Sequence, residues 1–117
     1  MSEQVSLIDW EQLDMIADGY TEDFVEIYRE FMVELPLVVE DISQAIMTGD
    51  ATLISRKAHQ LKGAAANFGF LEVSSLAAKL EMDAKSGNIT DAATQLSALQ
   101  TALQSSMAVV AAEKGMK

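Results

Sequence analysis

The chain has 117 residues, of which 50% are apolar, one is proline and none is cysteine. This length and composition predict a single domain over residues 1–117, long enough to bury about two thirds of its unfolded surface without disulfides or metals. The formal net charge of −10 argues against a general binder of nucleic acid or anionic membranes, and the lack of cysteine excludes thiolate chemistry.

The first two predicted helices lie between residue 9 and residue 48. Asp9 is suited to cap a short helix that runs to about Asp18, and Thr21 is suited to cap the next one. The seam of that second helix has apolar residues at alternating steps of four and three: Phe24, Tyr28, Phe31, Leu35, Val38, Ile42 and Ala45. An interior proline costs about 3 kcal/mol, so Pro36 leaves two separate helices as an alternative. The helical spacing of the apolar residues is the same before and after Pro36, which favours one bent helix.

Three further helices are predicted after the turn at Thr48–Asp50. The first of them ends near Gly69, where glycine suits a left-handed C-terminal position, and the next spans roughly Leu71–Lys85. Thr90 or Asp91 would cap the last. In the helix over Leu71–Lys85 the residues expected to be buried are Val73, Leu76, Ala77, Leu80 and Ala84. In the last helix they are Ala92, Leu96, Leu99, Leu103 and Val110. No strand-like alternation or repeat occurs, so we expect an all-α antiparallel four-helix bundle with a short additional N-terminal helix.

His59, the single histidine of the chain, lies in the third predicted helix, the one that follows the turn at Thr48–Asp50. Projected at about 100° per residue, Phe68 falls about 180° from His59 and Leu61 about 160° from it. The other apolar residues of the segment lie within about 60° of Phe68: Leu53, Ile54, Ala64 and Ala65. A lone histidine is often a core residue bonded to a backbone carbonyl. Here it lies opposite the apolar stripe, so we expect it to face water.

Small and basic residues surround the histidine on its helix face. Those within about 60° of it are Thr52, Ser55, Arg56, Lys62, Gly63 and Ala66. No acid occurs between Ala51 and Leu71, and five of the eight basic residues belong to the third and fourth predicted helices: Arg56, Lys57, Lys62, Lys79 and Lys85. The pattern predicts a local positive patch that receives an anion.

Gly63 stands in the middle of this helix, where glycine costs about 1 kcal/mol relative to alanine. Two explanations are open. A partner could approach closely beside His59, or a neighbouring helix could cross tightly at this point. Gly63 projects about 40° from His59 and away from the apolar stripe, which favours the approach of a partner.

Residues 58–69, AHQLKGAAANFG, closely resemble the signature of histidine-containing phosphotransfer (HPt) domains. In that family His-x-Leu-Lys-Gly lies on the second helix of a four-helix bundle, and a glycine follows after a short apolar stretch. The resemblance extends to residues 23–50, which look like the family's long preceding helix, and to residues 76–88, which look like the following helix. Gln60 and Phe70 stand where smaller residues are common, a difference that concerns partner preference.

The resemblance implies that His59 accepts a phosphoryl group from an aspartyl phosphate on a receiver domain and passes it to another receiver. Imidazole side chains in water are mostly neutral at physiological pH, which leaves a ring nitrogen free as nucleophile. Lys62 would offset the charge of the group, and Arg56, ahead of Lys57, would assist orientation. The residues expected to bind the receiver are Gly63, Arg56, Ser55, Thr52, Ala66 and Gln60.

The sequence holds no nucleotide-binding loop, so we expect a phosphoryl carrier that is not an enzyme in its own right and cannot phosphorylate itself from ATP. The Mg²⁺ needed for transfer would belong to the receiver, and one histidine without cysteine argues against zinc. Expected partners are response-regulator receivers and a hybrid histidine kinase, with the carrier as a monomer. The acidic first residues do not resemble a secretory signal, and a cytoplasmic location is expected.

Two other classes of function remain open. A non-catalytic helical adaptor would bind response regulators or other proteins through the bundle faces and leave His59 idle. Incubation with a phosphorylated receiver separates the two, because only a carrier removes the label. A hydrolase would use His59 as general base and would need a nucleophile or metal that the sequence does not specify.

Overall fold

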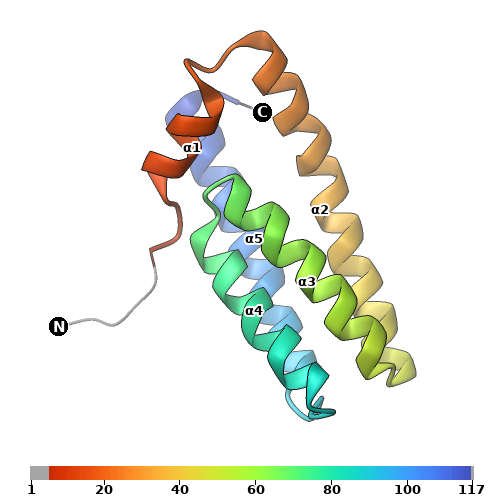
Figure 1. Ribbon diagram of the computed structural model, residues 1–117. Coiled ribbons are helices and arrows are strands. Elements are labelled where there is room, and N and C mark those ends of the chain that lie inside the picture. Colours follow the sequence, from red (N-terminus) through yellow and green to blue (C-terminus); the bar gives the residue numbers. More distant parts are fainter. Residues whose placement is uncertain (1–5, 117) are drawn as a thin grey trace, which may run out of the picture.

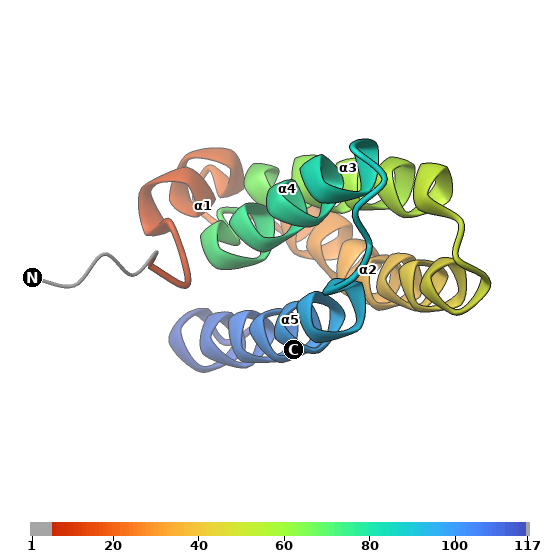
Figure 2. The ribbon, with the colours of Figure 1, turned by 90° about the horizontal axis from the view of Figure 1, so that it is seen from below.

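The computed structural model describes residues 6–116, and its helices form a bundle (Figure 1). Their bounds are α1 Trp10–Ala17, α2 Glu22–Thr48, α3 Ala51–Asn67, α4 Leu71–Lys85 and α5 Ala92–Lys114. Seen along the bundle, α3 and α4 form one layer and α2 and α5 the other, with α1 beside the ends of α3 and α4 (Figure 2). Contacts join α2 to α3 and α5, and α4 to α3 and α5. The predicted all-α four-helix bundle with a short additional helix is therefore confirmed.

The helix boundaries follow from the capping residues. The side chains of Asp9, Thr21 and Asp50 accept hydrogen bonds from the backbone N–H three residues later, at 3.0–3.2 Å, as an N-cap should. Asp91 occupies the N-cap position of α5 without a capping side-chain bond. α2 runs unbroken through Pro36, so one helix is present and the two-helix alternative is wrong.

The turn between α3 and α4 is held against the segment before α1. Gly69 has a φ of +75°, and a Cβ added there would lie 2.5 Å from the carbonyl oxygen of Asp9. The backbone N–H of Asp9 donates to the carbonyl of Gly69 at 2.7 Å, and Ile8 and Phe70 form an antiparallel bridge. Glycine is required here by both the left-handed backbone and the close approach. The contact fixes the ends of the two helices of one layer.

An aromatic cluster fills the core behind this turn. The ring of Phe68 packs 4.9 Å from that of Phe31 and 5.7 Å from that of Tyr28, centroid to centroid. Phe24 and Phe70 also contact this group. Phe68 is fully buried, and removing a phenyl ring from such a core usually costs about 3–5 kcal/mol. The cluster orients α3 by holding its apolar face inward.

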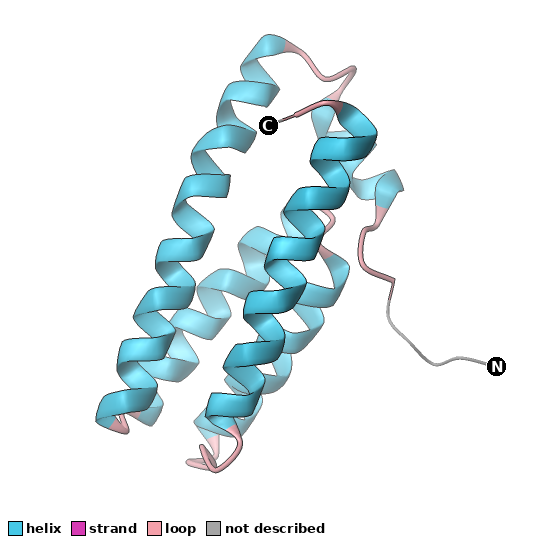
Figure 3. Cartoon of the chain, turned by 180° about the vertical axis from the view of Figure 1, so that it is seen from behind, coloured by secondary structure: helices cyan, strands magenta, loops and turns pink. Residues whose placement is uncertain are grey.

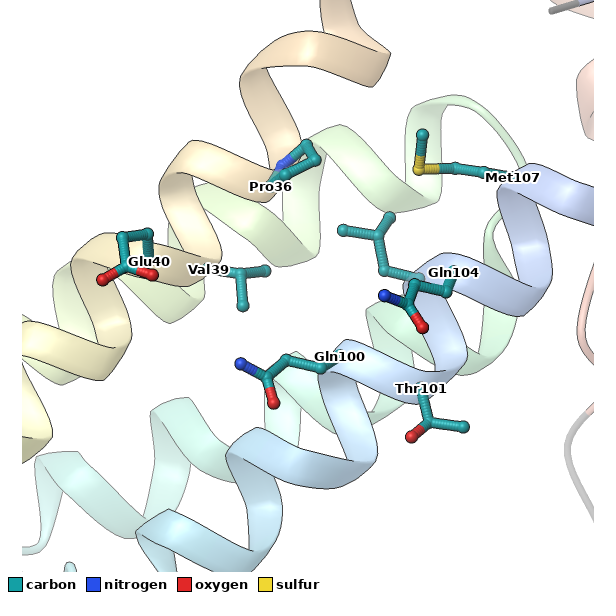
Figure 4. Close-up of a pocket in the computed structure, with 8 residues that line it drawn as sticks. Pro36, Val39, Glu40, Gln100, Thr101, Gln104 and Met107 are labelled. Atoms are coloured by element: carbon teal, nitrogen blue, oxygen red, sulfur yellow. The ribbon is translucent and has the colours of Figure 1, made fainter.

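A hollow of about 650 Å³ lies between α2 and α5 (Figure 4), and these two helices form the layer away from α3 and α4 (Figure 3). Pro36 and Glu40 line it from α2, and Gln100, Gln104 and Met107 line it from α5. Its polar side chains are two amides, one hydroxyl and the carboxylate of Glu40, with no basic group among them, and His59 is on α3 in the other layer. The chemistry of the molecule is therefore to be sought on the α3 and α4 side.

Candidate functional site

His59 projects from the solvent face of α3. Its side chain is 67% exposed, whereas Phe68, which the helical projection placed opposite it, is 1% exposed. The prediction that the histidine faces water is confirmed. A buried core histidine is excluded, because the apolar face of α3 is occupied by Ile54, Leu61 and Ala65.

A carboxylate from α4 lies directly beside the imidazole. Oε2 of Glu81 is 2.9 Å from Nδ1 of His59, and the Glu81 side chain is only 5% exposed. The expectation of an acid-free surface around the histidine is therefore wrong. It held for α3 alone, and packing of α4 against α3 brings in an acid that lies 22 residues further along the chain.

Two lysines share this carboxylate with the histidine. Nζ of Lys62 lies 2.8 Å from Oε1 of Glu81, and Nζ of Lys85 lies 3.4 Å from Oε2. The hydrogen bond from Lys62 is the main cause that lowers the pKa of Glu81, the contact with His59 adds to it, and burial opposes both, leaving a pKa of about 2. Glu81 is therefore a charged carboxylate at neutral pH.

The charged carboxylate determines how the imidazole is protonated. A carboxylate only accepts hydrogen bonds, so Nδ1 of His59 must carry the proton that Oε2 of Glu81 accepts. We assign the tautomer from this hydrogen bond. Nε2 of the neutral ring then keeps its lone pair, on a side chain that is mostly exposed. The arrangement can present a nucleophilic nitrogen to a partner.

Gly63 lies in open space. A Cβ added there would meet nothing within 4 Å, which excludes a tight helix crossing as the reason for glycine. Thr52 and Ala66 are likewise exposed on the face of His59, and Gln60 is exposed next to it in the chain. They leave a surface of small and neutral side chains on which a partner could rest.

The remaining residues chosen from the sequence separate into two groups. Arg56 is exposed, whereas Ser55 is 9% exposed and lies against α4, lining a hollow with Ala84. Lys57 points the other way and pairs with Asp41 of α2 at 3.2 Å. This position agrees with the preference for Arg56 over Lys57 as the residue that assists orientation of the phosphoryl group. The roles that the sequence suggested for these residues stay predictions.

Sequence reasoning missed Glu81 and did not include Lys85 among the site residues. A signal for Glu81 was present: it follows Ala77 by four residues and precedes Ala84 by three, so it falls on the buried stripe of α4. A charged residue on an apolar stripe requires a partner from a neighbouring element. Lys85, four residues after Glu81, follows from the same spacing.

Metal-binding and membrane-spanning features were also sought in residues 6–116. No group of three or more histidine, cysteine or acidic side chains in this part could hold a metal ion. None of the described helices combines the length and the apolar character needed to cross a bilayer.

Comparison with known proteins gives two matches. The family model of the Hpt domain matches residues 26–109. Among solved structures, the crystal structure of histidine-containing phosphotransfer protein B (HptB) from Pseudomonas aeruginosa PAO1 is similar with a TM-score of 0.88 at 17% identity, covering 95% of this chain and 96% of that one. No curated protein matches the chain significantly.

Proposed function

Because this chain belongs to the Hpt domain family and is a histidine phosphotransfer carrier of phosphorelays, we propose that His59 is the residue that carries the phosphoryl group. The observation on which this rests is the geometry of His59 and Glu81. The imidazole is exposed to a partner, and the buried carboxylate binds its Nδ1 at 2.9 Å.

In the proposed reaction Nε2 of His59 attacks the phosphorus of an aspartyl phosphate on a receiver domain. The Nε2–P bond forms as the acyl O–P bond breaks, and the aspartate carboxylate leaves with the electron pair of that bond. The proton on Nδ1 stays in place, so the product is a phosphorylated imidazolium. Transfer to a second receiver is the same step in reverse, with that receiver's aspartate as the nucleophile.

Glu81 supports both directions of this transfer. Its hydrogen bond to Nδ1 holds the ring in one orientation and in the tautomer that leaves Nε2 free. Since the ring gains positive charge as the Nε2–P bond forms, a fixed carboxylate beside it stabilises the product more than the starting imidazole. Glu81 is thus a positioning residue that also favours the charged state of the ring.

Lys62 and Gly63 have separate proposed roles. Lys62 balances the charge of Glu81 at 2.8 Å and contributes positive potential for the incoming phosphoryl group. The open space at Gly63 lets the loops of a receiver come close to His59. Thr52, Gln60 and Ala66 extend the same docking surface.

The chain is a phosphotransfer intermediate, and we propose that it has no ATP-dependent kinase activity of its own, which the lack of a nucleotide-binding loop in the sequence supports. Interaction with receiver domains follows from the family. A hybrid histidine kinase as a further partner and Mg²⁺ bound by the receiver's carboxylates are parts of the proposal. The monomeric state and the cytoplasmic location expected from the sequence stay predictions.

The substitution His59→Gln tests the assignment. A glutamine can still donate a hydrogen bond to Glu81, and surface substitutions usually change stability by less than about 0.5 kcal/mol. We expect unchanged helicity, a nearly unchanged melting temperature and complete loss of label from a phosphorylated receiver. Label retained on the variant would contradict the assignment. Lys57→Gln, on the α2 side of α3, is the matched control that should still accept label.

A further inference from the structure

A shallow hollow of about 280 Å³ opens beside His59 between α3 and α4. It is lined by Ser55, Arg56, His59, Glu81 and Lys85. A second hollow, of about 300 Å³, adjoins it and shares Ser55, Arg56 and Lys85. Arg56 and Lys85 thus line both hollows, one from each helix, on the side of His59 away from Gly63 along α3.

Lys85 can bind a ligand while it remains paired with Glu81. Its ammonium lies 3.4 Å from Oε2 of Glu81, the same oxygen that binds Nδ1 of His59. The side chain is 68% exposed, and an ammonium has three donors, so donors are left for a group arriving at the histidine. Lys62 differs because its side chain is 35% exposed and its ammonium is held 2.8 Å from Oε1.

Arg56 supplies an unpaired positive charge on the opposite side of the hollow. Its side chain is exposed, and it makes no ion pair with any residue between 6 and 116. Ser55, one residue before it, is nearly buried and forms the floor. A guanidinium offers paired donors that match two oxygens of a tetrahedral anion.

We propose that Arg56 and Lys85 form a phosphoryl seat, a site that binds the oxygens of the phosphoryl group carried on His59. This inference rests on the proposed function and assigns the direct contact with the phosphoryl group to these two residues, with Lys62 acting through Glu81. The seat explains why an acidic chain keeps, beside its single histidine, an arginine that forms no ion pair within residues 6–116. It also leaves the Gly63 side of the imidazole open to the receiver.

Binding of inorganic phosphate to the unphosphorylated protein tests the seat without any transfer step. Phosphate is titrated into ¹⁵N-labelled protein at low ionic strength, and amide shifts are followed in α3 and α4. The variants are Arg56→Gln, Lys85→Gln and the double variant. The control is Lys79→Gln, an exposed lysine of α4 that lines neither hollow. We expect affinity to fall about two- to fivefold in each single variant and about tenfold in the double variant, as for exposed charge pairs, with no change in the control.

Labelling by phosphoramidate then tests the seat on the reacting histidine without a receiver. The P–N bond of the donor breaks, ammonia leaves and the Nε2–P bond forms on His59. We expect the labelling rate to fall in the same order as phosphate affinity. Equal values for the double variant and the Lys79→Gln control in both measurements would overturn the seat while His59 stays the acceptor. Phosphate binding that depends on Arg56 and Lys85, in a protein that takes no label from any phosphorylated receiver, would support the seat and contradict the proposed function.

Discussion

Glu81 and Asp14 are each surrounded by positive or donating groups, but they differ in which member of the cluster faces water. The Glu81 side chain is 5% exposed, while His59 and Lys85 around it are 67% and 68% exposed. The Asp14 side chain is 52% exposed, and its partner Lys114 is 29% exposed. Lys114 lies over the rings of Trp10 and Tyr20, 5.6 and 5.0 Å from their centroids.

The difference separates the cluster that we propose to be reactive from a structural one. A buried carboxylate directs its donors outward, where they can meet an anion. The Asp14 cluster faces the other way: the acid is in water, accepts a hydrogen bond from Tyr20 at 2.6 Å and pairs with Lys114 at 3.2 Å. The Lys114 ammonium lies over the rings of Trp10 and Tyr20, where cation–π contact stabilises it. This cluster fastens α1 to the end of α5 and presents no positive charge to a ligand.

The largest effect is expected from Glu81→Ala. Removal of the partner that orients a functional histidine typically lowers activity by about 10- to 100-fold, and we expect a loss of this size in transfer from a phosphorylated receiver. Asp14→Ala should change the transfer rate by less than about twofold, since its cluster touches no reacting group. Glu81→Gln, which keeps an acceptor oxygen without the charge, should fall between them. Equal rates for Glu81→Ala and Asp14→Ala would contradict the distinction between the clusters.

Gly63→Gln should give the next largest effect. Nothing lies within 4 Å of an added Cβ, so Gly63→Ala and Gly63→Gln should both stabilise α3, by up to about 1 kcal/mol. The long glutamine should nevertheless lower receiver binding about tenfold, because it occupies the approach to His59. Melting curves and a transfer time course measure the two effects. The control is Ala112→Gln, at an exposed position of α5 two residues before Lys114. Normal transfer by Gly63→Gln would show that docking does not use the open space at Gly63.

Removing one lysine from each cluster should have smaller and different effects. Lys62→Ala frees Oε1 of Glu81 and should slow transfer severalfold, and Lys62→Glu should be worse because it adds a like charge beside Glu81. Lys114→Ala should leave transfer unchanged and lower the melting temperature by roughly 2–4 °C through loss of its contacts with α1. A slowed transfer in Lys114→Ala would mean that both clusters affect the reaction.

The pH dependence of stability is expected to show the smallest difference. The pKa of Glu81 falls from its ordinary 4.5 to about 2 on folding, mainly because of the Lys62 hydrogen bond. The stability from this shift is complete above pH 4.5 and is lost as the pH falls to about 2. The stability gap between wild type and Glu81→Gln should therefore shrink over this window in urea unfolding. A stability gap between wild type and Glu81→Gln that stays constant over this pH range would contradict the lowered pKa of Glu81. Asp14→Asn is the variant for comparison, since Tyr20 and Lys114 also lower the pKa of Asp14.

Local chemistry made most of the fold predictable. Asp9, Thr21 and Asp50 cap helices through their own side chains. Aspartate or threonine just before a helical pattern of apolar residues predicts an N-cap from the sequence alone. The outward direction of His59 followed from the period of its own helix. Gly69 was predicted as a helix terminator, but its contact with Asp9 depends on a chain segment 60 residues away and could not be read from the turn alone.

The candidate site was only half predictable for the same reason. His59, Lys62 and Gly63 lie on one helix, where spacing determines the face that they share. Glu81 and Lys85 enter from α4, and which residues of two packed helices meet depends on their rotation and axial offset. Ser55 shares the face of the histidine by projection and is nevertheless nearly buried, because α4 covers that edge of α3. Tertiary packing therefore decided the carboxylate partner, the tautomer and the position of the hollow.

The most direct test of the account is the ring nitrogen that bears the phosphoryl group. Protein with ¹⁵N-labelled histidine is phosphorylated by a phosphorylated receiver, and ¹⁵N and ³¹P NMR identify the substituted nitrogen; with one histidine in the chain, the assignment is unambiguous. Because Glu81 occupies Nδ1 at 2.9 Å, we predict that phosphorus is bound to Nε2 and that Nδ1 keeps its proton. Phosphorus on Nδ1 would contradict the role given to Glu81, since that nitrogen cannot hold both groups.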